Sequence, residues 1–219
     1  MSLFEGRDLT CLRGARVVFA GLDFALSAGG ALVLVGPNGS GKSSLLRLMS
    51  GLSRPFAGGL FWDGAPVANE PGAHAARLRY IGHLDAVKPA LTAAENLAAW
   101  AGLDGGGDPA GRALRALDRF GLAHLAEVPG RYLSAGQKRR VNLARLALAP
   151  APLWLLDEPT TALDRAAVAR LAELVRDHRA AGGMVAVSTH MDLDLAGPVL
   201  LDVSDFAPEP ADAVAEMPA

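Results

Sequence analysis

Apolar positions along the chain fall into short runs of strand length and longer segments with helical spacing. The run Ala31–Val35 is continuous and contains only apolar side chains, which is typical of a strand buried on both faces. Gly36 ends this run, and residues 43–50 then repeat apolar side chains at the spacing of a helix that stops at Gly51. The strands predicted in this third of the chain are 17–19, 22–26, Ala31–Val35, 60–62 and 78–81.

The middle third, about 88–149, is predicted to be a helical insert, because three segments there begin with residues that cap helices. The capping pairs are Thr92 with Glu95, Asp108 with Pro109, and Ser134 with Gln137. Gly121 is expected to end the second helix. The inward residues predicted for that helix are Leu114, Leu117 and Phe120. The third helix is predicted to run through Leu148 to Pro150.

The last third returns to alternating strands and helices. Leu153–Leu156 is predicted to be a buried strand, and Asp164 is predicted to cap a helix that ends at Gly182. Two more strands are predicted, at Met184–Ser188 and at 198–203. Because buried strands alternate with helices, the pattern predicts a mostly parallel α/β sheet that binds ligands at the carboxyl ends of its strands.

These elements are predicted to form one domain, 1–204, whose core (1–82 and 150–204) is interrupted by the insert. A chain of 219 residues is long enough to bury a sizeable core. The remaining segment, 205–219, has four acids, no bases and three prolines, and we expect it to be a disordered tail.

The balance of charges excludes some classes of protein. The 21 basic and 23 acidic residues give a net charge of -2, which argues against nucleic-acid binding and against a polybasic membrane anchor. Cys11 is the only cysteine, so the chain has no internal disulfide. No apolar run approaches the ~20 residues of a membrane-spanning helix, and the first residues do not resemble a signal peptide. We therefore expect the protein to stay in the cytoplasm.

A glycine-rich segment follows the strand Ala31–Val35 and fits the pattern G-x-x-x-x-G-K-[ST]. Its glycines let backbone N–H groups surround phosphates, and the helix that follows points the positive end of its dipole at them. Lys42, one of only three lysines, is expected to reach the β- and γ-phosphates. The residues predicted to bind the nucleotide are Gly36, Pro37, Asn38, Gly39, Ser40, Gly41, Lys42, Ser43 and Ser44.

A pair of carboxylates follows the apolar strand Leu153–Leu156. Asp157 at the strand tip is predicted to hold Mg²⁺ together with the Ser43 hydroxyl. Glu158, one residue further, is positioned to polarise an attacking water. Together with the glycine-rich loop, the pair predicts a nucleoside-triphosphate hydrolase that uses Mg²⁺.

Three further segments complete a resemblance to ATP-binding-cassette (ABC) ATPases. The segment Leu133, Ser134, Ala135, Gly136 and Gln137 resembles the family's signature motif, Asp164 its D-loop and His190 its catalytic switch histidine. The resemblance implies an ABC-type nucleotide-binding domain with a mostly parallel core sheet, N-terminal antiparallel strands and an inserted helical subdomain. It also implies a head-to-tail dimer of two copies, in which the signature of one copy binds the γ-phosphate held by the other.

The chain departs from the general ABC pattern at Arg13, His83 and Ala135, where an adenine-stacking aromatic, the Q-loop glutamine and a signature glycine are usual. These residues are similar to those of ATP-binding subunits of cytochrome c maturation (Ccm) haem exporters. The segments that carry this likeness are 11–14, 19–24, 52–55, 82–83, Lys88 and 133–141. The likeness implies integral-membrane haem-exporter subunits as partners and a peripheral location on the cytoplasmic face of the inner membrane. We identify no direct haem ligand in the chain.

Other functions are compatible with parts of this pattern. One alternative is an ABC cassette that drives export of another cargo, and the residues Arg13, His83 and Ala135 argue against it. A second is a soluble, non-transport ABC protein, which the single cassette and the acidic tail disfavour. A third is a scaffold that binds nucleotide without hydrolysis, which the presence of Glu158 and His190 opposes.

Overall fold

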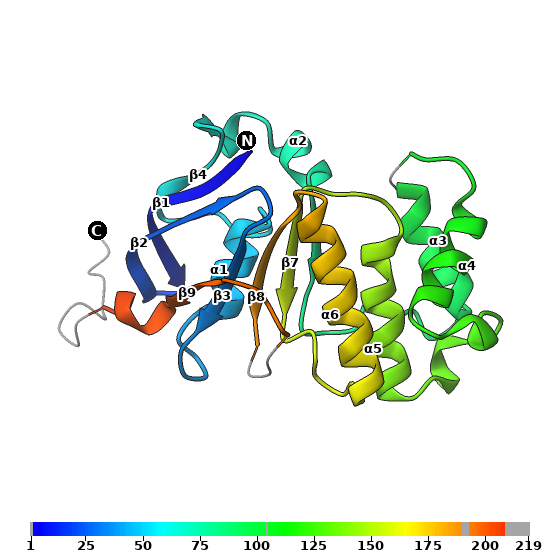
Figure 1. The fold of residues 1–219 in the computed structure, drawn as a ribbon. Helices are drawn as coiled ribbons and strands as arrows, with labels where there is room; N and C mark the ends of the chain where they lie inside the picture. The colour runs from blue at the N-terminus through cyan, green and yellow to red at the C-terminus, as the bar shows by residue number, and fades with distance from the viewer. Residues whose placement is uncertain (1, 104, 190–192, 209–219) are drawn as a thin grey trace.

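The computed structural model describes residues 2–103, 105–189 and 193–208 of the chain. Two β-sheets and a group of helices make up the fold (Figure 1). In spatial order, the parallel sheet contains β6 (Leu78–Ile81), β7 (Leu153–Asp157), β8 (Met184–Ser188), β3 (Ala31–Val35) and β9 (Val199–Asp202). The antiparallel sheet contains β2 (Arg16–Ser27), β1 (Leu3–Arg13), β4 (Ala57–Trp62) and β5 (Ala65–Pro66). The predicted α/β class, with a parallel core and antiparallel N-terminal strands, is confirmed.

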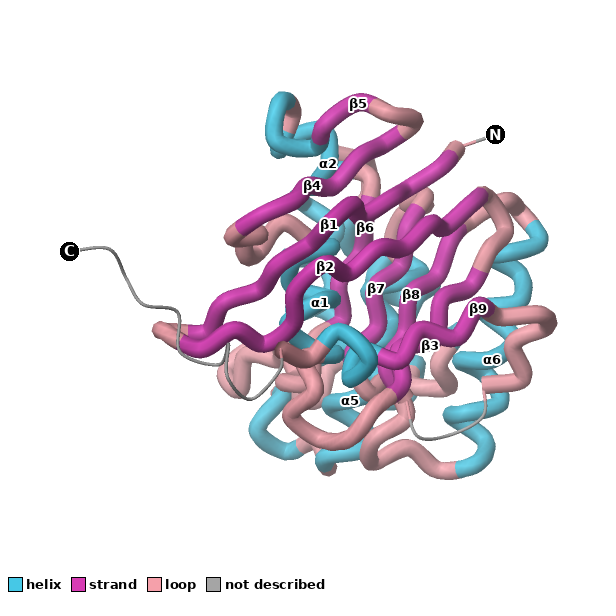
Figure 2. Tube along the Cα trace, turned by 90° about the vertical axis from the view of Figure 1, so that its left-hand side faces the viewer, coloured by secondary structure: helices cyan, strands magenta, loops and turns pink. Residues whose placement is uncertain are grey.

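Helices cover the parallel sheet, and α1 lies between the two sheets (Figures 1 and 2). The α-helices are α1 (Lys42–Met49), α2 (Pro71–Ala76), α3 (Ala93–Leu103), α4 (Pro109–Arg119), α5 (Ala135–Ala144) and α6 (Arg165–Ala180). Short 3₁₀ helices span Val67–Asn69, Ala123–Leu125, Gly130–Tyr132, Arg145–Ala147 and Val203–Phe206. Among these described helices, none is long and apolar enough to cross a membrane.

The central strands of the parallel sheet divide the core into two clusters. Along β7, Leu153 and Leu155 face the cluster that includes α1 and the antiparallel sheet, while Trp154 and Leu156 face the cluster shared with α5 and α6. Because successive side chains of a strand point to opposite faces, a strand buried on both sides must be apolar throughout. This requirement explains the uninterrupted apolar runs in the sequence.

The first strand is the main element that the sequence pattern missed. Leu3–Arg13 pairs with both β2 and β4, but its register shifts between Gly6 and Leu9. Asp8 lies at this irregularity with a left-handed φ of 51°, which breaks the alternation of inward and outward side chains. The separate strands predicted at 17–19 and 22–26 are parts of the single strand β2.

Two predictions about the helices are wrong. The helical spacing predicts that Leu114 points inward, but its side chain is 48% exposed. The buried face of α4 contains Ala113, Ala116 and Leu117. Alanines occupy that face because α3 packs closely against α4. The helix that begins after Ser134 ends at Ala144, before Leu148, because the chain then tightens into a 3₁₀ turn.

The C-terminal boundary also differs from the prediction. The sequence predicts Asp205 and Phe206 in the disordered tail, but they belong to a 3₁₀ helix whose Val203 is fully buried. Val203 joins the cluster around α1, so apolar packing anchors this turn. The segment 209–219 lies outside the described residues.

A buried histidine joins α2 to the antiparallel sheet and to α1. The Trp62 indole N–H donates to His74 Nδ1 at 2.9 Å, so His74 Nε2 carries the proton and donates to the Met49 carbonyl at 2.9 Å. Burial lowers the pKa of His74 below its ordinary value of 6.5. Protonation of Nδ1 would remove the acceptor of the Trp62 hydrogen bond, so the packed arrangement requires the neutral ring.

This arrangement predicts a pH-dependent stability. Because the folded-state pKa of His74 lies below the unfolded value, its contribution is fully present above about pH 6.5 and is lost as the pH falls. His74→Gln should therefore lose less unfolding free energy than the wild type between about pH 7.5 and 5.5. Urea denaturation at both pH values measures this difference. His124→Gln is the exposed control, and equal slopes for all three proteins would contradict the prediction.

Candidate functional site

The glycine-rich loop lies between β3 and α1, and two of its glycines are required by its shape. Gly36 has a φ of 124°, and a Cβ there would lie 2.8 Å from Ser40 Oγ and 2.9 Å from Asp202 Oδ1. Gly41 has a φ of 108°, and a Cβ there would lie 2.7 Å from Val18 Cγ1. Other residues would strain the backbone and collide at both places. The loop therefore keeps a tight turn with its backbone close to β2.

Lys42 begins α1, and its ammonium folds back into the loop. Nζ donates to the Gly36 carbonyl at 2.7 Å and to the Pro37 carbonyl at 3.0 Å, and the residue is buried. The N-terminal N–H groups of α1 lie in the same region, with the positive end of the helix dipole. Backbone donors and one ammonium thus converge on one small volume, which is what an anionic phosphate requires.

Asp157 ends β7 and accepts two hydroxyl hydrogen bonds on one oxygen. Ser43 Oγ donates to Asp157 Oδ1 at 3.0 Å, and Ser188 Oγ donates to the same atom at 2.8 Å. Asp157 is only 3% exposed, and Ser188 is its register partner on β8. A carboxylate beside a hydroxyl is the oxygen donor set that Mg²⁺ prefers, and waters and phosphate oxygens usually complete its shell. The described residues contain no cluster of three acids, histidines or cysteines.

Glu158 follows directly and adopts a left-handed backbone conformation with a φ of 46°. Its N–H donates to the Ser188 carbonyl at 2.9 Å and lies 3.2 Å from Ser188 Oγ. This turn sends the chain away from β7 while Glu158 stays at the edge of the sheet, beside the glycine-rich loop. The strained backbone at this carboxylate is a feature that clusters at functional sites.

These residues line one cleft of about 440 Å³. Its walls are Asn38, Gly39, Gly41, Lys42, Ser43 and Ser44 from the loop, Asp157, Glu158 and Ser188 from the sheet edge, and Arg13, Arg16 and Val18 from the antiparallel sheet. Most of the predicted nucleotide-binding residues therefore meet the two carboxylates. Arg13, where the general ABC pattern has an adenine-stacking aromatic, is part of this wall. His190 lies outside the described residues.

The predicted signature residues do not line this cleft, as far as the structure describes it. They form the start of α5, where Ser134 Oγ accepts from the Gln137 N–H at 3.2 Å and Gln137 Oε1 accepts from the Ser134 N–H at 2.7 Å. Ala135 is the first helical residue, so its methyl group is tolerated. A Cβ on Gly136 would lie 2.7 Å from the Ala162 carbonyl, so α5 approaches the segment before Asp164 closely.

Asp164 caps α6 as predicted, because its Oδ1 accepts from the Ala167 N–H at 2.7 Å. His83 is exposed after β6 and lines a second hollow of about 820 Å³ that also touches Ser43 and Asp157. Tyr80 lies in the same wall, and burial and the charge of Asp157 raise the pKa of its hydroxyl. The residue at the predicted Q-loop position thus lines a hollow that Asp157 also lines.

Sequence reasoning missed three polar residues at the site. Ser188 ends an apolar strand and gave no motif, although the end of a buried strand is where ligands bind in such sheets. Arg16 begins β2 and belongs to no phosphate-binding motif in the sequence. Asp202 ends β9 beside the loop, and hydrogen bonds from Ser204 lower its pKa, with a further contribution from the charge of Lys42.

A model of the ABC transporter family matches residues 19–161. The chain belongs to the ABC transporter family. Within it, the chain is 60% identical to the "Cytochrome c biogenesis ATP-binding export protein CcmA" of Rhodospirillum rubrum, over 96% of this chain and 89% of the relative. It is 61% identical to the protein of the same name from Paramagnetospirillum magneticum, over 94% of this chain and 96% of the relative.

A solved structure has the same fold. The ATP-binding cassette MJ0796, in a dimeric post-hydrolysis state with ADP and Pi, matches with a TM-score of 0.79 and 25% identity, over 92% of this chain and 95% of that one. The chain is therefore an ABC-type ATPase that binds ATP, which confirms the predicted family, fold and enzyme class.

The hydrogen bond from Ser188 to Asp157 predicts that loss of the Ser188 hydroxyl slows ATP hydrolysis. Ser188→Ala removes one of the two donors that orient Asp157, so ATP hydrolysis should fall about 10-fold and need more Mg²⁺ for half-maximal rate. Steady-state phosphate release across a Mg²⁺ titration measures both quantities. Ser50→Ala is the matched control, because that buried hydroxyl bonds the Arg47 carbonyl, outside the cleft. A wild-type Mg²⁺ dependence in Ser188→Ala would contradict the assignment.

Proposed function

We propose that this chain is the ATP-hydrolysing subunit of a membrane ABC complex for cytochrome c biogenesis, in which hydrolysis drives haem export or the release of a haem-loaded chaperone. The observation that carries the proposal is the convergence of Lys42, Asp157 and Glu158 on one cleft, in a chain with near-full-length likeness to CcmA proteins. The cleft supports the chemistry, and the relatives support the biological process.

In the proposed reaction, Lys42 and the loop N–H groups bind the β- and γ-phosphates. Ser43 and Asp157 hold Mg²⁺, which neutralises phosphate charge when it is bound. Glu158 accepts a hydrogen bond from the attacking water and holds it in line with the γ-phosphorus. His190, which follows β8 in the sequence, contacts the γ-phosphate in this proposal. Positioning and charge compensation supply most of the catalysis, since phosphoryl transfer requires little covalent chemistry from the protein.

We infer that the site is completed by a second copy of the chain in head-to-tail arrangement. The signature residues 133–137 do not line the cleft of their own chain, as described above, and Ser134 is exposed at a helix N-terminus that suits a phosphate. The similar cassette MJ0796 is dimeric with its products bound, which supports the arrangement. Asp164 follows closely after Ala162, whose carbonyl approaches Gly136 of the signature, and in this proposal Asp164 contacts the partner copy.

The partners proposed beyond the dimer are integral-membrane haem-exporter subunits, with this chain on the cytoplasmic face of the inner membrane. The word "export" in the names of the relatives supports this placement, and no residue of this chain is assigned as a haem ligand. Nucleic acid is not among the proposed partners, since the net charge is -2. We also propose that residues 1–206 form one domain with a helical subdomain at about 88–149, because the 3₁₀ helix Val203–Phe206 extends the folded part beyond the predicted boundary at 204.

Two substitutions separate binding from hydrolysis. Glu158→Gln should bind ATP but hydrolyse it about 100-fold or more slowly, because the group that orients water is lost, and it should accumulate as an ATP-bound dimer. Lys42→Ala should lose hydrolysis through loss of nucleotide binding. Phosphate release, nucleotide titration and size-exclusion chromatography with ATP distinguish the two. Wild-type hydrolysis by Glu158→Gln would remove Glu158 from its proposed role.

Co-purification from gently solubilised membranes tests the biological assignment. The tagged wild-type chain should bring down polytopic haem-handling subunits in stoichiometric amounts, identified by mass spectrometry. If transporter subunits of another kind are recovered instead, the chain is still a transport ATPase, but the assignment to cytochrome c biogenesis is wrong. A wholly soluble pool without membrane partners would discard both transporter proposals.

A further inference from the structure

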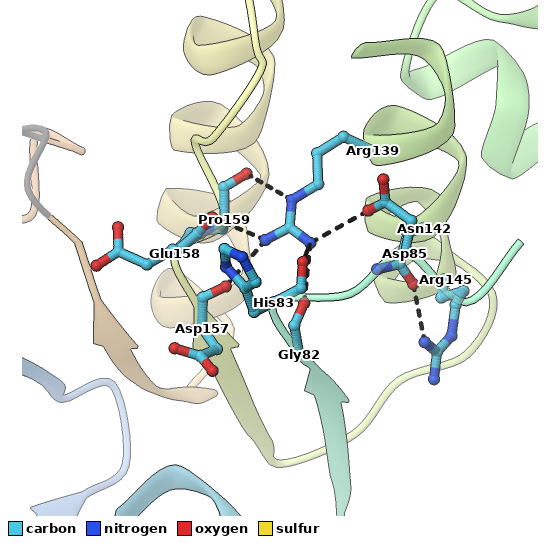
Figure 3. Close-up of polar contacts among 9 residues, drawn as sticks. All are labelled: Gly82, His83, Asp85, Arg139, Asn142, Arg145, Asp157, Glu158 and Pro159. Atoms are coloured by element: carbon cyan, nitrogen blue, oxygen red, sulfur yellow. Dashed lines mark hydrogen bonds and ion pairs between the residues drawn. The ribbon is translucent and has the colours of Figure 1, made fainter. Parts of the chain in front are cut away.

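Arg139 lies in the second turn of α5 and is buried at 2% exposure, next to the segment that carries Glu158 (Figure 3). We propose that Arg139 is a positioning residue for hydrolysis, which holds the backbone of Glu158 in place and ties it to the signature helix. The proposal rests on the proposed function, because it assumes that Glu158 orients the attacking water.

The guanidinium donates hydrogen bonds to carbonyls of two chain segments, residues 157–159 at the end of β7 and residues 82–83 after β6. Nη2 donates to the Asp157 carbonyl at 2.9 Å and to the Glu158 carbonyl at 2.7 Å, and Nε donates to the Pro159 carbonyl at 3.3 Å. Nη1 donates to the Gly82 carbonyl at 2.9 Å and lies 3.4 Å from the His83 carbonyl. All three nitrogens of this side chain therefore donate hydrogen bonds. They bind the three consecutive carbonyls of residues 157–159 and the two carbonyls of residues 82–83.

These hydrogen bonds hold the backbone on both sides of Glu158, whose left-handed conformation depends on its surroundings. The peptide groups on both sides of the Glu158 Cα are held, because the Asp157 and Glu158 carbonyls bind Arg139 while the Glu158 N–H binds the Ser188 carbonyl. A non-glycine residue adopts a left-handed conformation only where its surroundings enforce it, and Glu158 has a φ of 46°. Fixing both peptide planes also fixes the direction of the Cα–Cβ bond of Glu158, and hence the direction in which its side chain leaves the backbone.

The charge of Arg139 is compensated mainly by carbonyl dipoles. The one carboxylate bonded to it among the described residues belongs to Asp85, 3.3 Å from Nη1 and partly exposed. The other N–H donors of the buried guanidinium bind backbone carbonyls, including those of Asp157 and Glu158. A lysine cannot reproduce this set of hydrogen bonds, because its ammonium is compact.

The position of Arg139 on α5 gives it a second consequence. Ser134 caps the same helix one turn earlier, and in the proposed dimer that end binds the nucleotide of the partner copy. Through its hydrogen bonds, Arg139 therefore links residues 82–83 and 157–159 to the helix whose N-terminus is proposed to bind the partner's nucleotide.

The experiment compares Arg139→Met and Arg139→Lys with the wild type in the full chain. Both variants should lower kcat about 100-fold, because a small displacement of the group that orients water has an effect of that size. KM for ATP and the affinity for nucleotide should stay within about 3-fold, since Lys42 and the loop are untouched. If Arg139→Met does not fold, Arg139→Lys carries the test, because it keeps the buried charge.

A matched control separates positioning from stability. Arg112→Met removes another guanidinium that donates to backbone carbonyls, those of Ala101 and Leu148, far from the cleft. It should lower the melting temperature while leaving kcat of the folded protein unchanged. If the Arg139 variants lose only thermal stability, as this control does, the positioning role is wrong.

The decisive readout is a double-mutant comparison. If Arg139 acts through Glu158, Arg139→Met should lower the residual rate of Glu158→Gln by less than about 3-fold, although it lowers the wild-type rate about 100-fold. Losses that multiply, or a raised KM with unchanged kcat, would overturn the proposal. A different result would contradict the proposed function itself. In that case Glu158→Gln would hydrolyse ATP at the wild-type rate, whatever the Arg139 variants do.

Discussion

The parallel pairing of β7, β8 and β3 is the constraint on which the site depends. Parallel strands end at the same edge, so the residues that follow or end them are brought together regardless of their separation in the chain. Asp157 lies beside Ser188 in this register, and the glycine-rich loop leaves β3 next to them. The sheet can be parallel only because apolar side chains cover both of its faces, those of α1 on one side and of α5 and α6 on the other.

Two buried cations of different kinds flank the carboxylate edge. Lys42 is held by carbonyls of the glycine-rich loop, on the side of the cleft where phosphate is proposed to bind. Arg139 lies behind the edge and holds the backbone that carries Asp157 and Glu158. A compact ammonium suits a charge that must be shared with a ligand, whereas a planar guanidinium suits several fixed carbonyls. The difference between these side chains matches the difference between binding and positioning.

Much of the fold was predictable because its signals are local. The apolar runs at Ala31–Val35 and Met184–Ser188 became strands at the predicted positions, and the caps Ser134 and Asp164 start helices. The failures arose where tertiary contacts override the pattern. Alanines rather than Leu114 occupy the buried face of α4, because small side chains allow closer helix packing. The sequence pattern does not predict β1, because its alternation of inward and outward side chains is broken at Asp8; hydrogen bonds to β2 and β4 hold it as one strand.

By itself, the sequence determined the chemistry of this protein: a phosphate-binding loop with Lys42, two carboxylates after a buried strand, and the likeness to ABC ATPases. These signals lie within short segments, where residue type and spacing are sufficient to identify them. Only the tertiary structure decided that Ser188 orients Asp157 and that Arg139 supports Glu158. Neither contact leaves a trace in a local pattern, because each joins residues from different elements through hydrogen bonds whose geometry exists only after the sheet and α5 have packed.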